Sequence, residues 1–183
     1  MWSYFGSKTS IVGYYPPPKK EMIIEPFAGT AKYALRYWQH DVLLVDKNEI
    51  IIAIWKWLQR AKKEDIQRLP HFLNTGYCLD DYEFECQEAK WLMGFLVSKG
   101  MESPRKTVTR WVGDDRPNSI NYSLNRIKAS LDKIRHWEIV LGDYRDIPNQ
   151  EATWFIDPPY ERGGHIYPHS SKEINFAELS EWC

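Results

Sequence analysis

The chain has 183 residues, of which 43% are hydrophobic and 15% aromatic, so one domain with a real core and room for an insertion is expected. The formal net charge of −1 excludes a uniformly basic nucleic-acid coat, although a local basic patch is compatible with it. The three cysteines form no CxxC pair, which argues against a zinc site or a disulfide framework and fits a reducing cytosol. No signal peptide or membrane span is evident, so a cytoplasmic protein is expected.

The first third of the chain alternates predicted strands and helices. After a loop at residues 1–21, Asn48 is placed to cap a strongly apolar helix. Alternation of this kind predicts an α/β sheet with parallel strands. The predicted elements are a strand at 22–26, a helix at about 30–40, a strand at 42–45 ending at Asp46, and a helix at 49–60.

The middle of the chain, residues 61–136, breaks that alternation and is predicted to be mostly helical. One helix carries an apolar stripe at spacings of four and three, formed by Ile120, Leu124, Ile127, Leu131 and Ile134. Basic residues concentrate in the second half of this segment. Those that we consider candidates for phosphate contacts are Arg105, Lys106, Arg110 and Arg126. An ordinary solvated loop is an equally good interpretation of the first three.

The α/β pattern then resumes. A strand is predicted at 138–141, followed by Gly142 and Asp143, and a second at 153–156, followed by Asp157. A final helix begins near Asn175 and the chain ends within it. Because its apolar stripe has no cap behind it, and because the strand at 153–156 becomes an edge, we expect a fragment or a truncated version of a longer protein.

The strongest chemical signal is Asp157-Pro158-Pro159-Tyr160, directly after an apolar strand. An adenine amino group is a poor nucleophile because its lone pair is delocalised into the ring. Rigid acceptors at its hydrogens, here the Asp157 carboxylate and the Pro158 carbonyl, would draw it towards tetrahedral geometry, and the prolines fix that carbonyl. Tyr160 offers a face for stacking. The alternative interpretation is a proline turn in which Asp157 is a local cap.

Three further positions follow strand ends. The turn from Glu25 through Phe27 to Gly29 lets a ligand approach the backbone, although one glycine alone is a weak signal. Asp46 lies 17 positions after Gly29, where acids of nucleoside-binding α/β folds accept hydrogen bonds from ribose; helix capping is the alternative. Asp143 is similarly placed after the next strand.

Together these features resemble the DNA adenine methylase type of amino-group DNA methyltransferases, in the same order along the chain. The resemblance assigns the catalytic role to the tetrapeptide 157–160 and gives Asp46 the ribose and Asp143 the cofactor adenine. It places Glu25, Phe27 and Gly29 in the turn under the cofactor. The N-terminal motif that resembles the family's site for the methionine end of the cofactor contains Tyr4, Gly6 and Lys8. Ala31 departs from the family, which often has a second glycine there.

The resemblance implies a Rossmann-like S-adenosylmethionine-dependent core at residues 1–60 and 137–183, with residues 61–136 as an inserted helical target-recognition segment. The family sheet has seven strands in the order 3-2-1-4-5-7-6, of which this chain supplies about four. The implied reaction is direct methyl transfer from S-adenosylmethionine, with S-adenosylhomocysteine as product, to an adenine flipped out of double-stranded DNA.

Other interpretations of the function remain open at this stage. One is a catalytically weak or inactive truncated relative that binds DNA or a partner protein. Another keeps the chemistry but changes the acceptor, for example to cytosine N4. No metal is expected, since His165 and His169 have no third ligand nearby. We also expect that the protein could self-associate, or bind a partner, through the exposed sheet edge. The expected location is the cytoplasm of a bacterium or of a phage-infected host cell.

Overall fold

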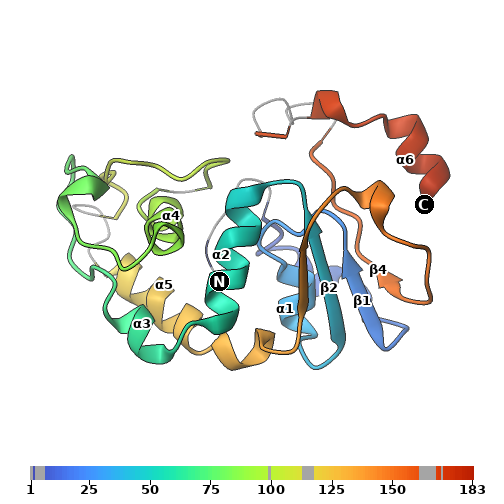
Figure 1. Ribbon diagram of the computed structural model, residues 1–183, viewed down its shortest axis with the longest axis horizontal. Coiled ribbons are helices and arrows are strands. Elements are labelled where there is room, and N and C mark those ends of the chain that lie inside the picture. Colours follow the sequence, from blue (N-terminus) through green and yellow to red (C-terminus); the bar gives the residue numbers. More distant parts are fainter. Residues whose placement is uncertain (1, 3–6, 99, 113–117, 161–167, 170) are drawn as a thin grey trace. The chain divides into compact units, whose positions relative to one another are not determined.

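The computed structural model describes residues 2, 7–98, 100–112, 118–160, 168–169 and 171–183 (Figure 1). The chain divides into two compact units. Unit 1 consists of Met1–Ser7 and Ala53–Arg135, and unit 2 of Lys8–Ile52 and His136–Cys183. The boundary between Arg135 and His136 lies next to the predicted end of the insertion at residue 136. The boundary between Ile52 and Ala53 falls within helix α2 (Glu49–Arg60), before the predicted start at residue 61.

Unit 2 is built on a parallel sheet of four described strands, as predicted. The strands are β1 (Met22–Glu25), β2 (Asp41–Asp46), β3 (Glu138–Leu141) and β4 (Thr153–Trp154). Their order, β3-β2-β1-β4, reproduces the first four positions of the order that the resemblance implies. In register, Ile24 lies opposite Leu43 of β2 and Trp154 of β4. Ile24 and Leu43 pack with Val45 and Ile147 into the core of the sheet.

Two elements of unit 2 are shorter than predicted. The strand expected at 153–156 pairs only over Thr153–Trp154, because its neighbour β1 ends at Glu25 and the next residue, Pro26, has no N–H to extend the ladder. The helix expected at about 30–40 is α1 (Lys32–Arg36). It begins only after Ala31, whose left-handed backbone is not helical, and it ends at Tyr37, whose backbone leaves the helical region.

Helix α2 has the predicted bounds, and local chemistry explains why. The side chain of Asn48 accepts hydrogen bonds from the backbone N–H groups of Ile50 at 3.0 Å and Ile51 at 3.4 Å, so it caps the first turn as expected. Trp55 and Trp57 are both buried and belong to the hydrophobic core. Trp2 packs on Trp55 with its ring centroid at 5.0 Å.

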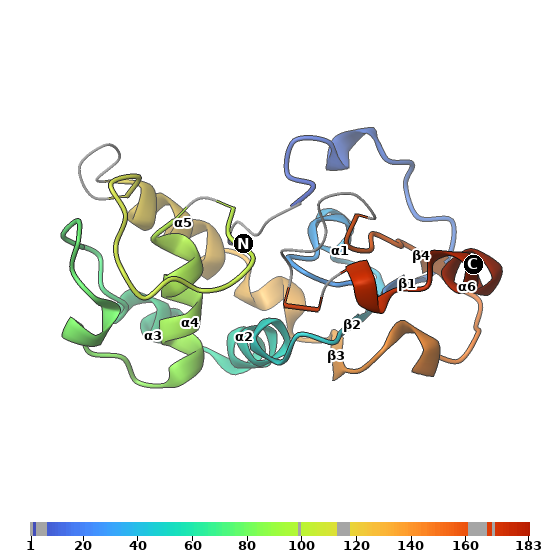
Figure 2. The same cartoon turned by 90° about the horizontal axis from the view of Figure 1, so that it is seen from above.

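Unit 1 is helical, with long connections between its helices (Figure 2). It contains α3 (Lys63–Gln67), α4 (Gln87–Leu96) and α5 (Ser119–Lys128). The predicted apolar stripe is buried along its whole length, but one helix does not carry all of it. The helix ends at Lys128, and a separate 3-10 turn, Leu131–Ile134, carries the last two residues of the stripe. Cys78 and Thr107 form an antiparallel bridge between two of the connections.

The C-terminal part of unit 2 consists of a 3-10 turn at Ser171–Glu173 and helix α6 (Phe176–Trp182). Asn175 caps α6 through its side-chain oxygen, which accepts from the N–H groups of Ala177 and Glu178, so the predicted start of this helix is confirmed. No helix in the part of the chain that the structure describes is long and apolar enough to cross a membrane.

Candidate active site

Four acidic residues of unit 2 lie where its parallel strands end. Glu25 and Asp46 are the last residues of β1 and β2, and Asp143 and Asp157 follow β3 and β4 by a few residues. Because all pairings are parallel, these ends lie at one edge of the sheet. Ligands of open α/β sheets bind outside this carboxyl edge. The structure therefore brings together the four acids that the sequence singled out.

The turn after β1 is fixed to the end of β2. The N–H of Gly29 donates to Asp46 Oδ2 at 2.9 Å, and the N–H of Ala28 donates to the Val45 carbonyl at 3.0 Å. Gly29 and Ala31 have φ values of +46° and +44°. A left-handed conformation is accessible to glycine but costs about 1–2 kcal/mol for a residue with a Cβ. Ala31 is therefore strained at the position where the resemblance leads one to expect glycine.

The Asp46 carboxylate is held by two backbone donors. Its Oδ2 accepts from Gly29, and its Oδ1 accepts from the N–H of Asn48 at 2.9 Å. Burial raises the pKa of Asp46, and these two hydrogen bonds oppose that rise. A carboxylate offers about four lone-pair positions. Two of them therefore receive no donor from the described residues, and the role of Asp46 in binding a ribose stays a prediction.

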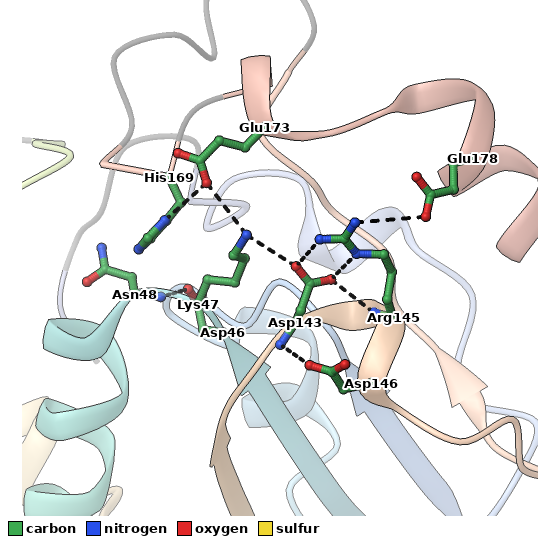
Figure 3. Close-up of polar contacts among 9 residues, drawn as sticks. All are labelled: Asp46, Lys47, Asn48, Asp143, Arg145, Asp146, His169, Glu173 and Glu178. Carbon is green, nitrogen blue, oxygen red and sulfur yellow. Dashed lines mark hydrogen bonds and ion pairs between the residues drawn. The ribbon is translucent and has the colours of Figure 1, made fainter.

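Asp143 is in a different situation, because its carboxylate is saturated with donors (Figure 3). Its Oδ1 accepts from the backbone N–H and from Nε of Arg145, both at 3.0 Å. Its Oδ2 accepts from the guanidinium of Arg145 at 2.9 Å and lies 3.2 Å from Nζ of Lys47. Hydrogen bonds from Arg145 and Lys47 hold the pKa of Asp143 well below its usual range, against the effect of burial. A cofactor adenine could use this carboxylate only by displacing one donor.

The same charges attach the C-terminal segment to the sheet (Figure 3). Lys47 Nζ lies 3.5 Å from a carboxylate oxygen of Glu173, which also contacts His169 Nδ1 at 3.3 Å. Arg145 lies 3.9 Å from a carboxylate oxygen of Glu178 in α6. Glu173 and Glu178 are thereby linked by ion pairs to residues that follow β2 and β3.

An aromatic surface lies beside these acids. The half-buried ring of Phe27 lies 5.4 Å from that of Tyr144, centroid to centroid, at an interplanar angle of 36°. Tyr144 in turn meets the edge of Trp182 at 5.2 Å, and Trp182 meets Trp154 at 5.1 Å. Phe27 is therefore a half-buried ring next to the glycine turn, and its place beside the cofactor stays a prediction.

Asp157 lies in contact with the N-terminal part of unit 2. The Nζ of Lys8 is 2.6 Å from Asp157 Oδ1 and donates to the hydroxyl of Tyr160 at 2.8 Å. The Lys8 and Asp157 side chains are 10% and 26% exposed. Burial raises the pKa of Asp157, and the charge of Lys8 opposes this rise. The tetrapeptide thus presents a carboxylate and a 49%-exposed tyrosine ring that share one ammonium group.

Glu25 faces the interior and not the solvent. Its side chain is buried, and Oε1 accepts a hydrogen bond of 2.6 Å from the N–H of Ala34 in the first turn of α1. Burial, with a smaller contribution from the nearby charge of Asp157, raises the pKa of Glu25 to about 8, against the opposing effect of the hydrogen bond from Ala34. At neutral pH this residue is therefore mainly a neutral carboxylic acid, which holds α1 in place.

Comparison with known families identifies the chain. The family model for D12 class N6 adenine-specific DNA methyltransferases matches residues 4–179. The chain belongs to this family. It is accordingly a site-specific adenine DNA methyltransferase that uses S-adenosylmethionine and acts on DNA, and the match favours a catalyst over a non-catalytic binding protein. No curated protein matches the chain.

The basic residues predicted to contact DNA lie in unit 1 of the methyltransferase. Arg105, Lys106 and Arg110 are exposed and share the connection between α4 and α5, whereas Arg126 is exposed in the last turn of α5. The connection is anchored, since the N–H of Arg105 donates to the Gly94 carbonyl at 3.0 Å. The structure thus brings three of the four together on one segment and places the fourth on a separate element.

Some residues of the methyltransferase site were predicted and others were not. Tyr4 and Gly6 of the N-terminal motif lie outside the described residues. Sequence reasoning missed Lys47 and Arg145, the donors to Asp143. The position of Arg145, two residues after the acid, could have suggested a local ion pair. Among the described residues no cluster of potential ligands for a metal ion is found.

Proposed function

We propose that unit 2 of this methyltransferase holds both the cofactor and the reacting amino group at the carboxyl edge of its sheet. The observation that carries the proposal is the pair of acids at two strand ends. Asp46 keeps two lone-pair positions beside a glycine turn, and Asp157 follows β4 with Oδ1 on Lys8. Asp46 would accept hydrogen bonds from the ribose of the cofactor, and Asp157 would accept one from the target amino group.

The residues present fit S-adenosylmethionine. Asp46 would accept hydrogen bonds from the ribose hydroxyls, the turn containing Gly29 allows close approach to the backbone, and Phe27 would contact the flat adenine ring. Glu25 holds the helix that follows this turn, because its carboxyl accepts a hydrogen bond from the N–H of Ala34 in α1. Asp143 would accept a hydrogen bond from the cofactor adenine if the adenine displaced one of the present donors, Arg145 or Lys47. When bound, the cofactor supplies an activated methyl group on a positively charged sulfur.

Methyl transfer itself then depends on the tetrapeptide 157–160. The amino group of a flipped adenine would donate one hydrogen bond to the Asp157 carboxylate and one to the Pro158 carbonyl, while the ring stacks on Tyr160. Pro159 helps to fix the direction of that carbonyl. The rate enhancement comes mostly from positioning and from acceptors that need no reorganisation. No metal ion has a place in this chemistry.

Unit 1 would supply target recognition, and residues 61–136 account for most of it. Basic residues outnumber acidic ones in this unit, whereas acidic residues predominate in unit 2. Arg105, Lys106, Arg110 and Arg126 would contact phosphates of double-stranded DNA and fix the register of the enzyme on it. Because DNA is the substrate, we place the enzyme in the cytoplasm of a bacterium or a phage-infected host.

The sheet edge at β4 is the proposed site of self-association or of a partner strand. A groove of about 520 Å³ runs along residues 152–156, with Tyr15, Lys19 and Lys20 among its lining. In a parallel strand, alternate residues direct their backbone groups to opposite sides. Phe155 donates to Ile24 of β1, so the backbone of Trp154 and Ile156 faces the groove. Sedimentation at increasing concentration would detect such association, and a monomer throughout would contradict it.

The proposed roles can be tested with labelled cofactor and unmethylated DNA, followed by nucleoside analysis. Wild-type protein should yield N6-methyladenine. Asp157→Ala should reduce turnover by about 100- to 1000-fold, because a preorganised acceptor is lost, while calorimetry shows little change in cofactor affinity. Replacing Asp81, an acid of unit 1 that is not placed in the site, provides a matched control. Normal methylation by the Asp157 variant would refute the mechanism.

A further inference from the structure

Lys8 makes contacts that its sequence motif does not predict. The resemblance places it at the methionine end of the cofactor. In the structure its ammonium group reaches the tetrapeptide, with Nζ 2.6 Å from Asp157 Oδ1 and 2.8 Å from the Tyr160 hydroxyl. Lys8 and Asp157 are 149 positions apart in the sequence, so only the fold brings them together.

The backbone at Lys8 is fixed as well as its side chain. Its carbonyl accepts from the N–H of Ile11 at 3.1 Å and from that of Val12 at 2.8 Å, which starts a turn that leads into the 3-10 helix Val12–Tyr14. The side chain is 10% exposed. A lysine held at both ends in this way constrains the group that it contacts, because neither partner can move without breaking these hydrogen bonds.

We propose that Lys8 is a positioning residue for methyl transfer: its ammonium group holds Oδ1 of Asp157, so that Oδ2 is directed to the amino group of the target adenine. The proposal rests on the function proposed above for Asp157. The carboxylate has two oxygens, and Lys8 contacts only Oδ1. Oδ2 is therefore the oxygen proposed to accept from the amino group. Within the residues that the structure describes, Lys8 is the only side chain with an ion pair or hydrogen bond to this carboxylate.

The charge of Lys8 also keeps Asp157 in the form that accepts hydrogen bonds. Burial favours the protonated acid and raises the pKa of Asp157, while Lys8 lowers it. The other titratable groups that bear on the pair are the Tyr160 hydroxyl and the buried carboxyl of Glu25. Without Lys8, the effect of burial would act unopposed. Asp157 would then be protonated at higher pH and would lose an acceptor position.

The test compares Lys8→Met and Lys8→Arg with Asp157→Asn and with the double variant Lys8→Met/Asp157→Asn, in single-turnover methylation of unmethylated DNA from pH 5.5 to 9. Calorimetric titration with S-adenosylmethionine and thermal melting accompany each variant. Lys56→Met serves as the control, because it removes the same charge from an exposed position of α2. These measurements separate an effect on the acceptor from an effect on the cofactor or on folding.

Lys8→Met is expected to lower the rate at neutral pH roughly 10- to 100-fold, less than the loss of Asp157 itself. The acidic limb of its pH–rate profile should move to higher pH, Lys8→Arg should restore it, and cofactor affinity should stay within about twofold. Because Lys8 acts through Asp157, the double variant should be no slower than Asp157→Asn alone.

Two results would overturn the proposal. One is a loss of cofactor affinity in Lys8→Met with an unchanged pH profile, which would return Lys8 to the methionine end. The other is a double variant much slower than Asp157→Asn. If Asp157→Asn itself methylates DNA at the wild-type rate, the function proposed for Asp157 fails, and that result is visible without any Lys8 variant. If Lys8→Met does not fold, Lys8→Arg tests the proposal in its place. It should fold and keep the acidic limb of the wild-type pH–rate profile, and a limb moved to higher pH would contradict the proposal.

Discussion

Replacing Glu25 with glutamine is expected to stabilise the protein at alkaline pH. The Glu25 side chain is buried, and its pKa is raised from 4.5 to about 8, mainly by burial. An amide of the same shape cannot ionise, and it keeps an oxygen to accept the hydrogen bond from the N–H of Ala34. Glutamine therefore reproduces the protonated form of Glu25 at every pH.

The size of the effect follows from proton linkage. Between pH 4.5 and about pH 8 the folded state keeps the Glu25 proton, whereas the unfolded chain releases it, so the free energy of unfolding falls as the pH rises. One pKa unit corresponds to about 1.4 kcal/mol, so the full shift is worth on the order of 5 kcal/mol. Below pH 4.5 both states are protonated and above pH 8 neither is, so Glu25 adds no slope outside this window.

Urea unfolding of wild type and Glu25→Gln at intervals from pH 5 to pH 9 would measure this effect. The two free energies of unfolding should be closest near pH 5 and should separate by several kcal/mol at pH 8.5, with Glu25→Gln the more stable. Glu21→Gln, at an exposed position just before β1, should follow the wild type. Parallel curves for wild type and Glu25→Gln over the whole range would refute a buried neutral carboxyl.

Asp46→Ala should weaken S-adenosylmethionine binding by about 1–3 kcal/mol in calorimetry, because ribose donors lose their acceptor; unchanged affinity in a folded variant would remove Asp46 from the site. Ala31→Gly should raise the free energy of unfolding by a few tenths to about 1 kcal/mol by relieving a φ of +44°, and a less stable variant would contradict that strain. Gly94→Ala should cost about 1–3 kcal/mol, since a Cβ there would lie 2.8 Å from the Arg105 carbonyl oxygen. It should also weaken DNA binding, whereas Gly13→Ala, with no atom closer than 3.8 Å, should change neither property.

Elements governed by local signals were predicted well from the sequence. Helix α2 combines an apolar pattern with a capping side chain at Asn48, and strand β3 is a short apolar run before Gly142; both have the predicted bounds. Elements whose limits depend on distant partners were not. Strand β4 stops where Pro26 ends the ladder of its neighbour, and no property of residues 153–156 contains that information.

The same distinction applies to the site. The positions of Asp46 and Asp157 were predictable, because an acid after a buried strand reaches the carboxyl edge of a parallel sheet in any fold of this class. The partners of these acids were not predictable. Lys8 of the N-terminal loop meets Asp157, and Lys47 after β2 meets Asp143 after β3, only because the fold brings these separate segments to that edge. Spacing along the chain cannot reveal such pairs.

The saturated carboxylate of Asp143 has a thermodynamic consequence. It receives donors from Lys47 and Arg145, and these two cations also hold Glu173 and Glu178 of the C-terminal segment. A ligand that takes one lone pair of Asp143 competes with the attachment of that segment. Thermodynamic linkage makes this competition reciprocal. If release of the segment raises the affinity for the ligand by some factor, ligand binding raises the equilibrium constant for release by the same factor. Ionic strength, which weakens exposed ion pairs, would then change cofactor affinity without any change in the residues that touch the cofactor.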